Sequence, residues 1–257
     1  MTLIAEPVVD SRPCSLFAKE RIGEAVAIAG AHWVPLFCGE NRKPSFLHRR
    51  RPLVEYPDYL TDSSLCLPEE LRSIPTLKGD SVAALAMAWH LQEHFSLKDR
   101  SVIFCGLREA ASLFWCGFLL SLDASLYLWD REKSFAERFA YDLYHESGVV
   151  VPVVYRESLH EGVPVLVHGN VSTPFLRNPI IPIHKDSLCF QWKKRLFPSA
   201  VMEGVLRGQG WHPPELEQLE SEKIRNDFMC RLKENQMTIW RERNLDNLRW
   251  GKYNTYN

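Results

Sequence analysis

The sequence predicts an α/β protein with a doubly wound parallel sheet, a smaller N-terminal α/β lobe and C-terminal helices. Three observations support this fold class. Residues 101–131, SVIFCGLREAASLFWCGFLLSLDASLYLWDR, follow the pattern strand, tight turn, helix, strand. Further short apolar segments alternate with helical ones downstream, as in sheets of parallel strands joined by crossover helices. The charged stretch 215–250 has spaced apolar residues that predict a long amphipathic helix or a pair of them.

The first part of the chain is predicted to form the N-terminal lobe. Residues 1–20 are expected to be a loosely placed lead-in. The run AVAIAGAHWVPLFC, residues 25–38, predicts one or two buried strands with a bend or break at Gly30 or Pro35. Residues 39–52 are basic and rich in turn formers, and residues 53–75 show little periodicity, so both segments are expected to be irregular connections over the surface.

A strong helical pattern, SVAALAMAWHLQEHF, begins at Ser81. Asp80 or Ser81 is predicted to cap this helix by accepting from its free amides. His90 and His94 are four residues apart and share one face, which is the spacing of a two-histidine metal site. The acid of an H-E-x-x-H motif is missing, so no metal site is expected.

Residues 101–131 match the first half of a dinucleotide-binding βαβ unit of the Rossmann type. In such units a glycine lets the turn approach a pyrophosphate at a helix N-terminus, and an acid about 20 residues later accepts from a ribose hydroxyl. Gly106 ends the first strand, and Asp130 follows it by 24 positions. The turn has one glycine where the usual fingerprint has three; Arg108 is expected to bind phosphate, and Glu109 to repel it unless it points away. An α/β core without a nucleotide therefore stays open as an alternative.

The remaining segments complete the predicted sheet. Ligands of doubly wound sheets bind beyond the carboxyl ends of the strands, so the residues at those ends are expected to share one crevice. Further strands are predicted at 149–155, 163–170 and 178–184, and helices at 131–148 and 197–210. The predicted cofactor-binding residues are Gly106, Leu107, Arg108, Asp130, Arg131, His168, Gly169 and Asn170.

Length and composition limit the classes of protein to consider. The 257 residues, 46% of them hydrophobic and 25% charged, are typical of a soluble globular protein. The net charge of −1 argues against a general nucleic-acid binder. Seven cysteines without a C-x-x-C pair argue against structural zinc and a disulfide framework. Because the start has no apolar leader and no run reaches the length of a membrane span, a cytoplasmic protein is expected.

The order of features from Lys78 to Ala140 resembles that of the shikimate and quinate dehydrogenases, a family of NAD(P)-dependent enzymes. The segment KGDSVAALAMAWHLQEHFSLKDRSVIFCG is similar to the helix that links the family's substrate lobe to its nucleotide-binding domain, together with the first strand. YLWDREKSFAERFA looks like the second strand with its cofactor-selecting turn, and VLVHGNVSTP falls where the family carries the loop facing the nicotinamide. The resemblance implies three parts: a substrate lobe (1–78), a dinucleotide-binding domain (79–212) and a helical extension (213–257).

The resemblance also implies the groups that would assist catalysis. In the family, a lysine of the substrate lobe and an aspartate of the linking segment bind the substrate hydroxyl and assist proton transfer. Asp80 matches the aspartate, and Lys43 lies 37 residues before it. Lys78 is a second candidate for the lysine, His168 is a candidate base, and a plain helix cap stays the alternative role of Asp80.

The leading hypothesis is an NAD(P)-dependent oxidoreductase that acts on a small hydroxy, oxo or amino carboxylic acid in biosynthesis. NAD is favoured because Asp130 would accept from the 2′-hydroxyl, whereas Arg131 would hold the 2′-phosphate of NADP. The first alternative is a non-catalytic Rossmann-like binding protein with a degenerate nucleotide site. The second is an S-adenosylmethionine-dependent methyltransferase, which also places an acid after its second strand. The expected partner is a small-molecule substrate, and the C-terminal helix would pack across a lobe or a partner subunit in a homodimer.

Overall fold

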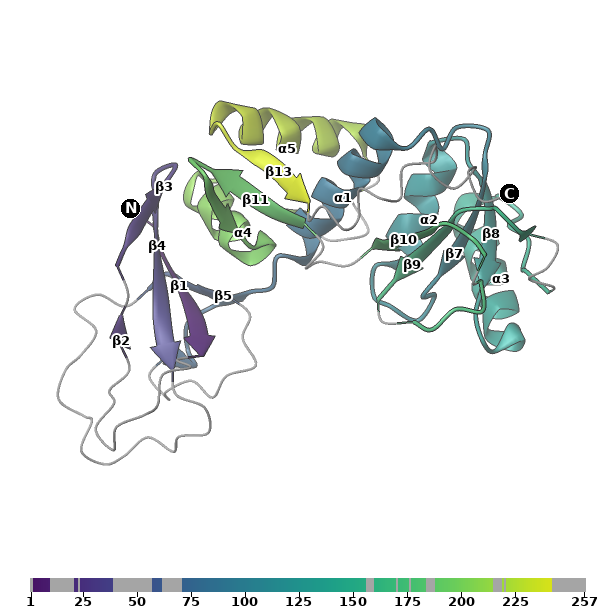
Figure 1. Cartoon of the computed structure of the whole chain (residues 1–257), viewed down its shortest axis with the longest axis horizontal. Helices are drawn as coiled ribbons and strands as arrows, with labels where there is room; N and C mark the ends of the chain where they lie inside the picture. The colour runs from purple at the N-terminus through teal and green to yellow at the C-terminus, as the bar shows by residue number, and fades with distance from the viewer. Residues whose placement is uncertain are drawn as a thin grey trace.

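The computed structural model describes residues 2–9, 21–22, 24–38, 57–61, 71–155, 160–169, 171–175, 177–183, 188–214, 219 and 221–241. Within these residues the chain forms three sheets, and two of them contain parallel strands (Figure 1). The predicted α/β class is confirmed. An N-terminal sheet and an all-parallel sheet lie at opposite ends of the molecule, and helices with a small antiparallel sheet lie between them.

The N-terminal sheet contains β1 as a central strand. β1 pairs in parallel with β4 along its whole length and with β5 at Ile4 and Ala5, in the order β2-β4-β1-β5-β6 with β3 paired to β4. The prediction of a loose lead-in was therefore wrong for residues 2–9. The strands are β1 (Thr2–Val9), β2 (Arg21–Ile22), β3 (Val26–Ile28), β4 (Ala31–Cys38), β5 (Tyr59–Thr61) and β6 (Thr76–Leu77).

The remaining predictions for the N-terminal lobe are confirmed in part. The two strands of residues 25–38 are confirmed, and the turn between them lies at Ala29 and Gly30, both with positive φ. A break at Pro35 was wrong, because Pro35 lies within β4 and pairs with Glu6 of β1. The irregular connection expected at 53–75 was wrong for residues 59–61, which form β5. The basic segment 39–52, with Lys43, lies outside the described residues.

The second sheet has the strand order of a Rossmann-type unit. Its four strands are parallel in the order β10-β9-β7-β8, and a single parallel bridge between Leu128 and Val153 places one more segment outside β8. Numbered along the chain, the order is 3-2-1-4-5, which is that of the first five Rossmann strands. The predicted strand at 149–155 is reduced to that bridge. The strands are β7 (Ser101–Cys105), β8 (Ser125–Trp129), β9 (Val165–His168) and β10 (Ile180–Ile183).

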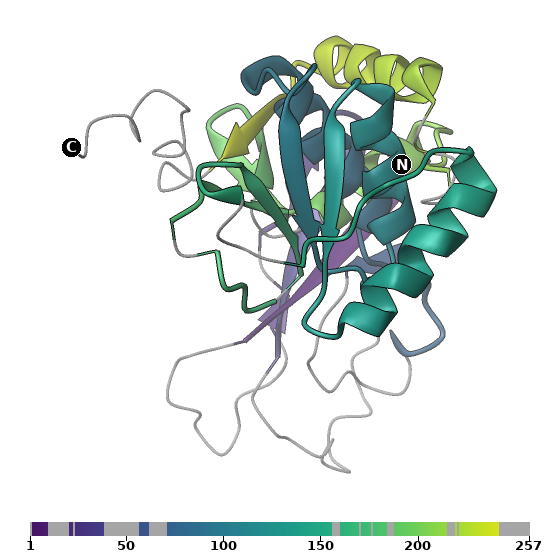
Figure 2. The same ribbon diagram turned by 90° about the vertical axis from the view of Figure 1, so that its right-hand side faces the viewer.

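The predicted helices are present as α1 (Asp80–His94), α2 (Ser112–Ser121), α3 (Lys133–Ser147) and α4 (Ser199–Gly208), and α5 (Glu222–Glu234) lies in the C-terminal stretch. α2 and α3 share a core with Phe104 and Leu128 on one face of the parallel sheet, and α3 runs along this sheet in Figure 2. On the other face Ile103 and Cys105 pack against Phe175, from the loop after β9. The loop after β9 thus helps to cover this second face of the parallel sheet.

The predicted cap of α1 was wrong. The N-cap residue is Gly79, with φ of 74°, and neither Asp80 nor Ser81 caps the free amides of the first turn. Asp80 is the first helical residue, where its negative charge is favourable to the helix dipole. A Cβ atom on Gly79 would overlap the backbone of Ser199 and Ala200, so the missing side chain lets the starts of α1 and α4 meet.

The C-terminal part returns to the N-terminal sheet. α4 packs against α1 and β1, and a third sheet with the order β12-β11-β13 is antiparallel. A helix across 215–250 was wrong for residues 238–241, because the chain turns at Gln236 and then pairs with β11. The strands are β11 (Leu188–Trp192), β12 (Arg195–Phe197) and β13 (Thr238–Arg241).

Candidate functional site

The site lies where the strand order of the parallel sheet reverses. β7 and β9 are neighbours, and the chain leaves their carboxyl ends toward opposite sides of the sheet order. Gly106 follows β7, and Gly169 follows β9. Crevices for ligands form at such switch points because the two connections diverge.

The two glycines bring the ends of β7 and β9 into close contact. Gly106 has φ of 100°, and a Cβ atom there would overlap the carbonyl oxygen of His168. Gly169 has φ of 75°, and a Cβ atom there would overlap the carboxylate of Glu109. Both backbones therefore approach protein atoms. In the predicted fingerprint, the absent side chain makes room for a phosphate. At Gly106 it makes room for the end of β9 instead.

The turn after Gly106 is closed by its own hydrogen bonds. Leu107 is buried, with 3% of its surface exposed. The hydroxyl of Ser112 lies 2.8 Å from the Gly106 carbonyl oxygen and 2.6 Å from that of Glu109, so it donates to one of them. The Glu109 amide donates to the Gly106 carbonyl at 3.2 Å. α2 begins directly afterwards at Ser112, without a side-chain cap.

Arg108 is bound to the carboxylate that was predicted to hold the ribose. Its Nη2 atom lies 3.0 Å from Asp130 Oδ1, and its Nε atom lies 3.3 Å from Oδ2. Nη2 also lies 2.8 Å from Glu132 Oε2, and the guanidinium lies 4.3 Å from the ring centroid of Phe135. These contacts raise the pKa of Arg108, and Arg108 in turn lowers the pKa of Glu132. Arg108 is thus directed to the end of β8 and away from the α2 N-terminus.

Asp130 is held firmly in this cluster. Its side chain is 11% exposed, and its Oδ1 atom also accepts from the Glu132 amide at 2.9 Å. Both oxygens thus have protein donors, and a ribose hydroxyl would have to displace Arg108. Arg131, the predicted binder of a 2′-phosphate, is exposed beside two carboxylates that would oppose a phosphate.

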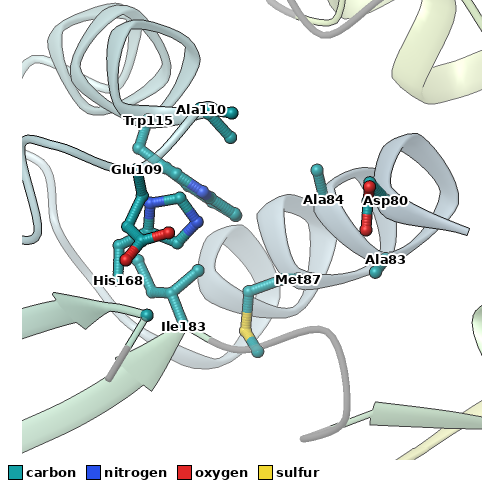
Figure 3. A pocket seen from close by; sticks show the side chains of 11 residues that line it. Asp80, Ala83, Ala84, Met87, Glu109, Ala110, Trp115, His168 and Ile183 are labelled. Carbon is teal, nitrogen blue, oxygen red and sulfur yellow. The ribbon is translucent and has the colours of Figure 1, made fainter. Parts of the chain in front are cut away.

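A pocket of about 270 Å³ opens between this switch point and α1 (Figure 3). Glu109, His168 and Trp115 form one wall, and Ala84 and Met87 face them from α1. The described residues that line it are Asp80, Ala83, Ala84, Met87, Glu109, Ala110, Ala111, Trp115, His168, Gly169 and Ile183.

The structure brings only part of the predicted site into this pocket. Asp80, His168 and Gly169 line it. Lys78 is exposed and outside the lining, while Gly106, Leu107, Arg108, Asp130 and Arg131 lie at the turn and at the end of β8. Lys43 and Asn170 lie outside the described residues.

His168 sits among aromatic rings. Its ring centroid is 6.3 Å from that of Phe104, in a stacked arrangement, and 6.3 Å from that of Trp115. This packing fixes the ring in the pocket wall, at the carboxyl end of β9. A fixed imidazole of this kind can bind a ligand or exchange a proton with it.

Other candidate chemical groups lie away from the pocket. Burial, together with the nearby charge of Asp130, raises the pKa of the Cys105 thiol, so this thiol stays protonated and unreactive. The rings of His90 and His94 are 4.4 Å apart at the far end of α1. Among the residues that the structure describes, no cluster of three metal-ligating side chains occurs.

The sequence argument missed the residues that line most of the pocket. Glu109 was judged only as an obstacle to phosphate, although its place directly after the β7 turn was a usable signal. Trp115 and Met87 lie in apolar helical patterns that indicate a core, and nothing in those patterns marks a pocket wall.

Comparisons with known proteins add no relative. No protein-family model matches the chain, and neither a curated protein nor a solved structure matches it. In the part of the chain that the structure describes, every helix is too short or too polar to cross a bilayer.

Proposed function

We propose that this chain is a Rossmann-like binding protein that holds a small organic molecule at the switch point and does not use a dinucleotide. The observation that carries the proposal is the pocket between α1 and the carboxyl ends of β7 and β9. Its volume of about 270 Å³ is just below the usual range for ligand pockets, about 300–1,000 Å³, so it suits only a small molecule. The pocket also combines apolar walls with a few polar groups, as ligand pockets do.

Three contacts support the absence of a dinucleotide. Arg108 occupies both oxygens of Asp130, where a ribose hydroxyl would bind. Gly106 packs against the backbone of His168. Glu109 adds a negative charge three residues before the start of α2, and this charge opposes a pyrophosphate at the helix start.

A thermal-shift screen of small metabolites tests the binding proposal. A ligand that binds only the folded state adds about 2.7 kcal/mol of stability at 100 times its Kd, so at least one compound should raise the midpoint of unfolding. Ala83→Leu adds a larger side chain to the pocket wall and should abolish the shift. Ala140→Leu, the same substitution on α3, should retain it. Compounds that shift wild type and Ala83→Leu equally would place binding outside the pocket.

The second candidate is an NAD(P)-dependent oxidoreductase that acts on a small hydroxy, oxo or amino carboxylic acid. The strand order 3-2-1-4-5, with Asp130 at the end of β8, favours it. In this case Arg108 would leave Asp130 when the ribose binds. Asp80, which lines the pocket, would then assist proton transfer to a substrate held against α1.

Calorimetric titration with NAD, NADP and S-adenosylhomocysteine separates the candidates. We expect wild type and Arg108→Ala to bind none of the three. Binding of NAD to wild type, weakened about tenfold or more in Asp130→Ala and unchanged in the exposed control Asp142→Ala, would establish the oxidoreductase site instead. Binding of S-adenosylhomocysteine alone would favour a methyltransferase.

A further inference from the structure

We infer that the switch-point pocket selects a small organic cation, a molecule with a protonated amine on an apolar body. This inference rests on the proposed function of the pocket and names its ligand class. It differs from the carboxylic acid that the oxidoreductase hypothesis requires. Four features of the pocket support it: an unpaired carboxylate, a second acid, an aromatic wall, and the absence of lysine and arginine from those lining residues that the structure describes.

Glu109 provides the charge that would bind the amine. Its carboxylate lines the pocket, is open to solvent and makes no hydrogen bond or ion pair with any residue that the structure describes. Asp80 places a second carboxylate on the pocket surface from α1. These two carboxylates would attract a cationic ligand in the pocket and would repel a ligand that carries a carboxylate.

The neighbouring cation is committed elsewhere. Arg108 precedes Glu109 in the chain, but its guanidinium is bound to Asp130 and Glu132 at 2.8 to 3.3 Å. Glu132 thus adds a second acceptor beyond the bidentate contact with Asp130, which holds Arg108 away from the pocket. The turn after β7 thus directs Arg108 to the carboxylates at the end of β8 and leaves Glu109 without an ion pair among the described residues.

Gly169 makes room for the Glu109 carboxylate. A Cβ atom at position 169 would overlap the carboxylate carbon and oxygen of Glu109. The backbone of Gly169 also has φ of 75°, which favours glycine. The carboxylate is therefore seated against the end of β9, at the rim of the cavity, and is not simply a side chain in open solvent.

The apolar body of the ligand has a matching surface. Trp115 is 2% exposed and presents its ring at the wall opposite α1, and Met87 faces it from α1 (Figure 3). Ile183 also lines the pocket. A tryptophan ring attracts cations more strongly than other aromatic rings and also buries apolar surface. The pocket thus offers a carboxylate for the ammonium head and an aromatic wall for the carbon skeleton.

Three probes with one carbon skeleton test the charge preference. Phenethylamine, 2-phenylethanol and 3-phenylpropionate share a phenyl ring on a two-carbon chain and carry a positive, a neutral and a negative head at pH 7. In calorimetric titrations we expect phenethylamine to bind about tenfold or more tightly than the other two. Glu109→Gln should weaken phenethylamine about tenfold and leave 2-phenylethanol unchanged. Glu93→Gln, which removes an exposed carboxylate at the other end of α1, should change neither.

The outcomes distinguish this inference from the proposed function. Equal or tighter binding of 3-phenylpropionate, or an unchanged preference in Glu109→Gln, would overturn the cation inference while the pocket still binds a small molecule. If all three probes fail and the metabolite screen finds only neutral or anionic ligands lost in Ala83→Leu, the inference fails and the pocket proposal stands. If neither experiment finds a ligand that Ala83→Leu excludes, both fail.

Discussion

Gly106 shows how a single residue serves the packing of the switch point. Two separate features favour glycine at this position. Its φ of 100° is rare for other residues, and a Cβ atom would overlap the carbonyl oxygen of His168. Gly106→Ala should therefore lower the free energy of unfolding by about 3 kcal/mol, from backbone strain and steric overlap together. Urea denaturation measures this loss.

Gly148 supplies the matched control for that substitution. It has φ of 72° at the C-cap of α3, but a Cβ atom there would meet nothing within 4 Å. Gly148→Ala should cost only the backbone strain, about 1 kcal/mol. Equal losses for the two variants would show that the contact with His168 carries no energy.

The kinds of residue at the site could be predicted from the sequence, but the hydrogen-bond partner of Arg108 could not. The sequence places an arginine and a glutamate after β7 and an aspartate after β8, and this much the strand pattern predicts correctly. Which carboxylate Arg108 would choose depends on the side-by-side placement of β7 and β8 and on Glu132 two residues later. The local sequence pattern does not show which side chains of neighbouring strands come close together. Arg108 was therefore expected to bind a phosphate, whereas in the structure it binds Asp130.

At the scale of elements, the start of α1 is held by a buried carboxylate of α4. The Gly79 amide donates to Glu203 Oε2 at 2.9 Å, and Arg207 Nη2 lies 2.8 Å from Glu203 Oε1. Glu203→Ala would leave a buried amide without its acceptor and Arg207 without its partner, so we expect a loss of about 2–4 kcal/mol in the free energy of unfolding. Hydrogen exchange of the first turn of α1 should quicken in the same variant.

Two further variants separate the hydrogen bond from general effects of substitution. Glu203→Gln keeps one oxygen that can accept from the Gly79 amide, but its NH2 group replaces the oxygen that accepts from Arg207, so its loss should be smaller than that of Glu203→Ala. Glu146→Ala, at an exposed site of α3, should change the free energy of unfolding by less than about 0.5 kcal/mol. A Glu203→Ala variant as stable as wild type would mean that α1 starts without this contact.

Elements with strong periodicity were predictable, and elements made by tertiary pairing were not. β7, β8 and the helices α1 to α4 have the apolar spacing of their type, and their positions were predicted within a few residues. β1 contains Glu6 and Pro7, which obscure a strand pattern, yet β4 pairs with all of it. β13 follows a helical pattern and becomes a strand because β11 offers it an antiparallel edge. In both cases the partner strand lies far away in sequence.

At the scale of the whole molecule, one core cluster contains residues from all three predicted parts. One continuous set of buried side chains runs from Ile4 of β1 through Leu85 of α1 and Phe118 of α2 to Phe228 of α5 and Met237. α4 belongs to the predicted part 79–212 but packs against β1, β4, β5 and β6 of the N-terminal sheet. The chain thus crosses between its two ends several times, a property of topology that sequence periodicity does not contain.

This shared core predicts that the middle part cannot fold alone. A fragment of residues 79–212 lacks β1, α5 and β13, so Trp211 would lose its ring contact with Phe228 at 5.9 Å, and Phe190 its contact with the same ring at 6.4 Å. Far more apolar surface would remain exposed than in the full chain, at about 25 cal/mol per Å². We expect the fragment to lack near-ultraviolet circular dichroism and a cooperative thermal transition, whereas the full chain should unfold in one transition at which near- and far-ultraviolet signals coincide. A fragment with a sharp transition of its own would show that the parallel sheet and α1 form an independent domain, and that the return of the chain to the N-terminal sheet adds stability without being required for the pocket.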